Sequence, residues 1–94
     1  MQDLLDKWQH IIELTKQSLS ETERRTLAKT SVLYIVRWLT ENLANNETEA
    51  LKIKALLRLY QSIRHHDHRI TTKEAGEFLP FADDLIKRLE LRQQ

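Results

Sequence analysis

Hydrophobic residues recur at spacings of three and four along most of this chain, which is the period of an amphipathic helix. The first apolar stripe begins near Asp3, a residue type that can cap the free amides of a first helical turn. We therefore predict a first helix from about Asp3 to Ser18. Its apolar stripe consists of Leu4, Leu5, Trp8, Ile11, Ile12, Thr15 and Leu19.

A second helix is predicted from about Glu21 to Ala44, because no glycine or proline interrupts these residues. Ser20 lies three residues before Glu23 and supplies a capping signal at the start of this helix. The β-branched run at residues 32–36 would also suit a strand, but the length of the uninterrupted segment favours a helix.

Two further capping signals introduce the remaining helices. Asn46 precedes Glu49 by three residues, and Thr71 precedes Glu74 by three. We predict a third helix from about residue 47 to 65 and a fourth that starts at Thr71. Their apolar stripes are Ala50, Ile53, Leu56, Leu57, Tyr60 and Ile63 in the third, and Ala75, Phe78, Leu79, Ala82, Ile86 and Leu89 in the fourth.

Pro80 lies inside the fourth stripe and cannot donate a hydrogen bond to the carbonyl of Gly76. We expect a kink near residues 76–80, or two short helices with Pro80 in the first turn of the second. One glycine and one proline in 94 residues leave few places for the tight turns of a sheet protein. The predicted fold is therefore all-α, an antiparallel four-helix bundle that forms a single domain over residues 1–94.

The composition gives information about the cellular compartment of the protein. There is no cysteine, so neither a disulfide framework nor a thiolate metal site is expected. The start of the chain has no basic region followed by an apolar run, and the longest apolar run, residues 32–36, is too short to span a membrane. We expect a cytoplasmic protein.

The charge is balanced overall but unevenly distributed. A net charge of +1, from 15 lysines and arginines against 14 acids, argues against a protein that binds nucleic acid. Residues 48–73, however, hold six lysines and arginines against two acids, and three of the four histidines fall in this section. Those histidines would gain charge below about pH 6.5, so a pH-sensing role is an open hypothesis.

The segment Ile-Arg-His-His-Asp-His-Arg-Ile at residues 63–70 suggests a metal site at first sight. Zinc needs three or four convergent ligands, but only His65 and His68 would share a face of a continuing helix, and the flanking arginines would repel a cation. We predict instead that the helix ends here. Asp67 suits a turn, and histidines in a last helical turn interact well with the helix dipole.

Enzymatic chemistry has little support in the sequence. Asp83 and Asp84 are adjacent carboxylates, but neighbouring residues on a helix point about 100° apart. Each has a base four residues on, which predicts the surface pairs Asp83–Lys87 and Asp84–Arg88. The sequence has no glycine-rich phosphate loop, nucleophile elbow or Cys/His pair. We predict no enzyme, no cofactor, no metal and no small-molecule substrate.

Two surfaces remain as candidate binding sites. The third helix offers Lys52, Lys54, Arg58 and Gln61, which gives weak support to DNA binding through a helix-turn-helix. In the fourth helix, Phe81 and Leu85 widen the apolar face beside Pro80. A broad apolar face can dock a partner helix or a membrane segment. The alternative is that both side chains complete the core of the bundle.

The segment from Leu56 to Leu89, LLRLYQSIRHHDHRITTKEAGEFLPFADDLIKRL, resembles the immunity proteins of pediocin-like (class IIa) bacteriocins. Their pattern is a Leu-x-x-Leu/Tyr-x-x-Ile helix, a polar basic turn, a Thr or Ser helix start and a final Leu-rich helix. The matching positions are Leu56, Leu59, Tyr60 and Ile63, then residues 64–69, then Thr71, and finally Phe78, Leu85, Ile86 and Leu89.

The resemblance implies a cytoplasmic, non-catalytic antiparallel four-helix bundle that protects a bacteriocin-producing Gram-positive cell. It implies action on the complex of the bacteriocin with the mannose phosphotransferase membrane receptor, with specificity in the C-terminal half. The basic section lies in that half and suits a partner close to a membrane surface. The rival interpretation is a small helical regulator that binds nucleic acid or another protein. The predicted contact residues are Arg58, Arg64, His65, His66, His68, Arg69, Phe81 and Leu85.

Overall fold

The computed structural model describes residues 2–22, 25 and 32–93. Over these residues the structure contains four helices and no strand, so the all-α class is confirmed. The helices are α1 (Gln2–Ser18), α3 (Val32–Asn42), α4 (Glu47–His65) and α5 (Thr72–Arg92). Residues 21, 22 and 25 are also helical.

The observed helix boundaries agree with the predicted ones to within two residues where they can be compared. α1 begins at Gln2, so Asp3 lies inside the helix and does not precede it as a cap. α3 ends at Asn42, two residues before the predicted end at Ala44. Part of the predicted second helix, with Glu23 of the predicted Ser20–Glu23 cap, lies outside the described residues.

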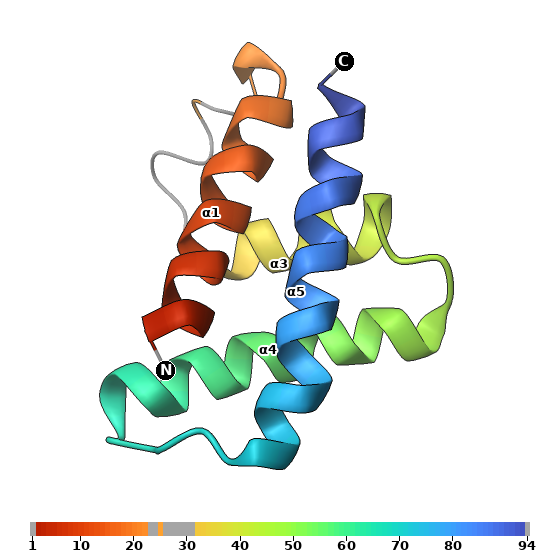
Figure 1. Ribbon diagram of the computed structural model, residues 1–94. Helices are drawn as coiled ribbons and strands as arrows, with labels where there is room; N and C mark the ends of the chain where they lie inside the picture. The colour runs from red at the N-terminus through yellow and green to blue at the C-terminus, as the bar shows by residue number, and fades with distance from the viewer. Residues whose placement is uncertain (1, 23–24, 26–31, 94) are drawn as a thin grey trace.

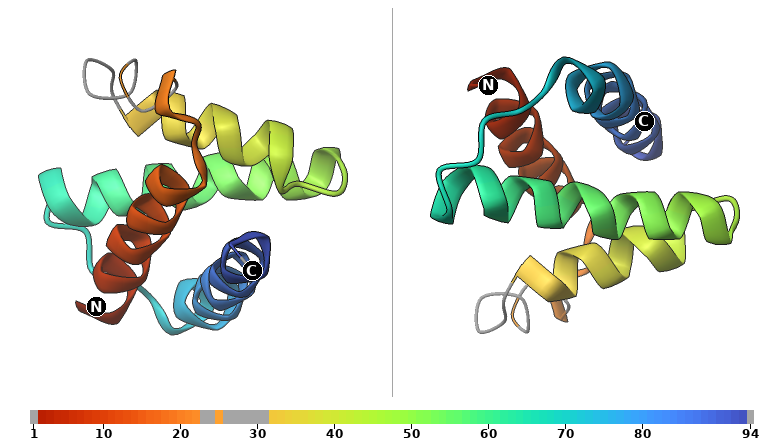
Figure 2. Two further views of the ribbon diagram at one scale, coloured as in Figure 1. Left: turned by 90° about the horizontal axis from the view of Figure 1, so that it is seen from above. Right: turned by 90° about the horizontal axis from the view of Figure 1, so that it is seen from below.

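The helices form two pairs that cross each other. α1 and α5 lie side by side and both run from the bottom to the top of Figure 1. α3 and α4 pack together and run in opposite directions across that first pair, as Figure 2 shows from two sides. The antiparallel order predicted for the four helices is therefore found in the α3–α4 pair and not in the α1–α5 pair. The turn after α4 carries the chain beneath the start of α1, so α5 begins at the end of the molecule where α1 begins (Figure 1).

Side chains from all four helices share one core. The predicted stripes are buried or partly buried wherever they fall in the described residues, and Leu14 and Leu59 are buried in addition. Burying each large aliphatic side chain contributes about 1.5–3 kcal/mol. The most completely buried large hydrophobic side chains are Leu4, Trp8 and Ile11 of α1, Leu39 of α3, Ile53 and Leu56 of α4, and Leu85 and Leu89 of α5.

Pro80 is accommodated inside α5, which continues without interruption to Arg92. The alternative of two short helices is therefore wrong. Pro80 and Gly76 are both exposed, so water can hydrate the Gly76 carbonyl that loses its helical donor. A kink near residues 76–80 stays a prediction.

Gly76 is a position where a larger residue should stabilise the fold. A Cβ built on Gly76 meets no atom within 4 Å, and a glycine in a helix interior costs about 0.5–1 kcal/mol relative to alanine. We expect Gly76→Ala to raise the free energy of unfolding by about that amount in urea titrations. Ala75→Gly, one residue earlier, should lower it by at least as much. A Gly76→Ala variant less stable than wild type would contradict this account.

Candidate functional site

The segment around the clustered histidines is a turn, as the sequence predicts. α4 ends at His65, and the backbone amides of His66 and His68 both donate to the carbonyl of Ser62, at 3.0 and 3.1 Å. Asp67 has a φ of 53°, in the left-handed region that aspartate tolerates better than most residues. A residue in this region cannot continue a right-handed helix, so the chain leaves the path of α4 here.

The turn is tied to the start of α5 through His68. Thr71 and Glu74 form the predicted reciprocal cap: the Thr71 amide donates to the Glu74 carboxylate at 2.9 Å, and the Glu74 amide donates to the Thr71 hydroxyl at 3.1 Å. The second pairing partner of Glu74 is His68, whose Nε2 lies 2.8 Å from Oε1. The Thr71 amide and then the His68 ring lower the pKa of Glu74 below its ordinary value.

The histidines of the turn therefore differ in their surroundings. His65 and His66 are exposed on the surface, whereas His68 is held against Glu74. Within residues 2–22, 25 and 32–93, no three His, Asp or Glu side chains converge as a metal ion would require.

The arginines near the turn are exposed and have no acidic partner among the described residues. These are Arg58 and Arg64 on α4 and Arg69 in the turn. By contrast, Arg25 pairs with Glu21 at 3.2 Å. We call Arg58, Arg64, His65, His66 and Arg69 the basic end of α4.

Phe81 and Leu85 do not belong to an exposed surface, which corrects their prediction as contact residues. Phe81 is 8% exposed and Leu85 is 0% exposed. The Nζ atom of Lys52 lies 4.9 Å from the centroid of the Phe81 ring and covers part of it from α4. The apolar face of α5 is broad because the helix packs against more than one neighbour, and the alternative that both residues complete the core is the correct one.

Arg88 connects α5 with two residues that are distant from it in sequence, Leu43 and Glu49. Its Nη1 donates to the Leu43 carbonyl and to Oε1 of Glu49, both at 3.1 Å, while Nη2 lies 2.9 Å from Oε2 of Glu49. Nη2 also lies 2.7 Å from Oδ2 of Asp84, which confirms the predicted Asp84–Arg88 pair. This bidentate contact holds α5 against the α3–α4 turn.

The acidic residues also form contacts that local spacing did not predict. Asp83 pairs with Lys7 of α1 at 2.6 Å, so the predicted Asp83–Lys87 pair is wrong. Asn46 caps α4 by accepting from the Glu49 amide at 2.9 Å, but the Glu49 carboxylate accepts the amide of Asn45 rather than that of Asn46. Bonding to Arg88, and then to the Asn45 amide, lowers the pKa of Glu49 to about 2.

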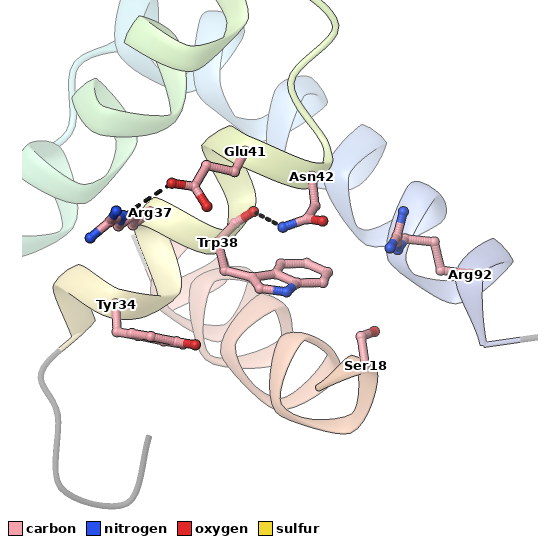
Figure 3. Close-up of a pocket in the computed structure, with 7 residues that line it drawn as sticks. All are labelled: Ser18, Tyr34, Arg37, Trp38, Glu41, Asn42 and Arg92. Carbon is pink, nitrogen blue, oxygen red and sulfur yellow. Dashed lines mark hydrogen bonds and ion pairs between the residues drawn. The ribbon is translucent and has the colours of Figure 1, made fainter. Parts of the chain in front are cut away.

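A pocket of about 460 Å³ lies at the other side of the molecule, where α1 and α5 end beside α3 (Figure 3). The guanidinium carbon of Arg92 lies 5.3 Å from the centroid of the Trp38 ring. The sequence did not point to this pocket, because its walls come from three segments that only the tertiary fold brings together. Its lining consists of Tyr34, Arg37, Trp38, Glu41 and Asn42 of α3, with Ser18 of α1 and Arg92 of α5.

Comparison with known proteins assigns the chain to no group: no family model matches it, and neither does any curated protein or solved structure. Among the helices that the structure describes, none combines the length and the apolar character needed to cross a bilayer.

We expect Glu49→Gln to lower the free energy of unfolding by about 1–2 kcal/mol at pH 7, because the variant loses a charge-assisted contact with Arg88. A folded-state pKa of about 2, below the ordinary value of 4.5, means that folding favours the ionised carboxylate. Its stabilisation is complete above about pH 5 and is lost as the pH falls towards 2. Urea titrations between pH 7 and 2 should show a smaller acid-induced loss in Glu49→Gln than in wild type.

Glu47→Gln is the matched control, since Glu47 lies in the same first turn of α4 and is exposed. Its profile should follow that of wild type. An acid profile of Glu49→Gln that also follows wild type would show that the contact with Arg88 does not stabilise the fold.

Asp67 offers a test of the turn itself. Asp67→Gly should keep or raise stability, by up to about 1 kcal/mol, because glycine adopts a positive φ without steric cost. Asp67→Val should lower stability by more than about 1 kcal/mol. His66→Gly is the control, because the φ of −127° at His66 suits any L-residue and glycine only adds flexibility to the unfolded chain. Thermal unfolding that ranks the valine variant above the glycine variant would contradict the left-handed turn.

Proposed function

We propose that this protein is a non-catalytic immunity protein that protects a bacteriocin-producing cell from a pediocin-like bacteriocin. In this proposal it acts in the cytoplasm, on the complex of the bacteriocin with the mannose phosphotransferase membrane components. The observation that supports the proposal best is the basic end of α4, where exposed arginines lie in the half of the chain that resembles the family.

The charges at the basic end of α4 are placed for contact with something outside the chain. Arg58, Arg64 and Arg69 are exposed and form no ion pair among the described residues. A group of such cations attracts an anionic surface and speeds the approach of a partner. Acidic loops of a receptor and anionic lipid headgroups are both surfaces of this kind.

The contact set in this proposal is smaller than the one expected from the sequence. It retains Arg58, Arg64, His65, His66 and Arg69, and it places His68 behind them as the residue that orients the turn through Glu74. Phe81 and Leu85 are excluded because they are buried. We also propose that α5 bends near residues 76–80, where Pro80 removes one helical hydrogen bond.

One observation supports the rival function, a helical regulator that binds nucleic acid. Lys54, Arg58 and Gln61 are exposed on α4 at the three- and four-residue spacing that places them on one face. Lys52 does not join them, because its ammonium group lies over the Phe81 ring. Two bases and one amide make a short track for phosphates.

The test is expression of the protein in a bacteriocin-sensitive strain, followed by challenge with a panel of pediocin-like peptides. We expect wild type to protect against at least one peptide and Arg64→Gln/Arg69→Gln to lose most of that protection, because the variant removes two charges from the contact surface. Arg25→Gln/Lys87→Gln removes the same charge from exposed positions elsewhere and should protect as wild type does.

Equal killing of cells with and without the wild-type protein, across the whole panel, would count heavily against the immunity function. DNA retention by the purified protein with a steep dependence on salt concentration would favour the regulator instead. Protection that survives in Arg64→Gln/Arg69→Gln would place the contact surface elsewhere on the molecule.

A further inference from the structure

We infer that the pocket between α1, α3 and α5 binds a small planar organic anion, with Arg92 pairing with its carboxylate and the aromatic side chains of α3 contacting its ring. This inference does not rest on the proposed immunity function. It rests on the charge of the pocket, the position of Arg92 and the aromatic lining (Figure 3).

The charge of the pocket is positive once its internal ion pair is counted. Arg37 Nε donates to Oε1 of Glu41 at 3.0 Å, one helical turn along α3, so these two charges offset each other. Arg92 is the remaining charged side chain in the lining, and it has no ion pair within the described part of the chain. An anion would provide the partner that Arg92 lacks.

Arg92 lies against an aromatic wall of the pocket. Its guanidinium lies over the indole of Trp38, at 5.3 Å from the ring centroid. This cation–π contact leaves the guanidinium without an acidic partner among the described residues, and its N–H groups are donors of the kind that a carboxylate accepts from. The neighbouring Gln93 donates from Nε2 to the Leu14 carbonyl at 3.1 Å, which fixes the end of α5 against α1 beside the pocket.

The aromatic lining suits a flat ring. Tyr34 and Trp38 lie one helical turn apart on α3, and their rings extend from the same side of the helix in Figure 3. Trp38 is 8% exposed and Tyr34 is half-buried, so a ligand contacts mainly the ring of Tyr34 and the small accessible part of the indole. A volume of about 460 Å³ falls within the usual range of small-molecule sites and accommodates a compound of one or two rings.

Two interactions of this kind predict weak binding, with a Kd of about millimolar. The helix ends at Ser18, Asn42 and Arg92 border the pocket and carry partial negative charge, which stabilises the Arg92 cation and reduces the attraction for an anion. Preference for a carboxylate over its neutral amide is therefore a sharper test of the inference than affinity.

The experiment follows the indole N–H resonances of Trp8 and Trp38 in ¹⁵N-labelled protein, assigned by the loss of one signal in Trp38→Phe. Wild type is titrated with indole-3-acetate and, separately, with indole-3-acetamide. We expect a saturable shift of the Trp38 signal with the carboxylate and at least tenfold weaker binding of the amide. The Trp8 signal, from a side chain that is fully buried in the core, should stay in place and reports that the fold is intact.

Arg92→Gln should remove the preference for the carboxylate, whereas Lys87→Gln, which removes an exposed charge from the same helix, should keep it. Arg92→Lys retains the charge without the planar fork and should bind the carboxylate less tightly than wild type but more tightly than Arg92→Gln. The absence of a saturable Trp38 shift would overturn the inference. Equal affinity for the acid and the amide would also overturn it, as would an unchanged preference in a folded Arg92→Gln variant.

Discussion

The burial of two crossed helix pairs against each other is the constraint on which the rest of this structure depends. Trp8 of α1 meets Tyr60 of α4 with ring centroids 5.7 Å apart, and Gln9 of α1 donates to the Tyr60 hydroxyl at 3.1 Å. The buried Nε1 of Trp8 has no hydrogen-bond partner in the described structure. The packing of the indole must therefore offset the free-energy cost of burying an unpaired donor. The core lies where the pairs cross, and each of the two candidate binding surfaces includes residues at helix ends.

The helices, their caps and their apolar stripes could be predicted because each depends on residues three or four positions apart. The shared direction of α1 and α5 could not, because it depends on the path of the turn after α4 beneath α1. Phe81 and Leu85 show the same limit. Their apolar character was evident in the sequence, but whether a neighbouring helix or solvent lies over them is decided by the tertiary arrangement.

The candidate site also has features that could be predicted from the sequence and features that could not. The turn around Asp67 was predictable, because residues that favour a helix end and a capping signal just after them indicate a turn at this position. Whether a given arginine forms an ion pair could not be predicted from the sequence. Arg64 and Arg88 both lie on amphipathic helices, yet Arg88 binds Glu49 and Arg64 is exposed without an ion pair among the described residues. The pocket around Trp38 required Ser18 and Arg92 from the ends of two other helices.

The charges that hold the helices together are separate from those that remain available for binding. The tertiary ion pairs among the described residues use Lys7 with Asp83 and Arg88 with Glu49. None of these four residues belongs to the basic end of α4 or to the pocket. A surface arginine that pairs with nothing contributes little to stability, whereas an arginine with a bidentate carboxylate partner contributes more. Substitution at the basic end or at Arg92 therefore changes the binding surface while the packed core and its ion pairs stay in place, and a loss of binding in such variants reports on recognition rather than on folding.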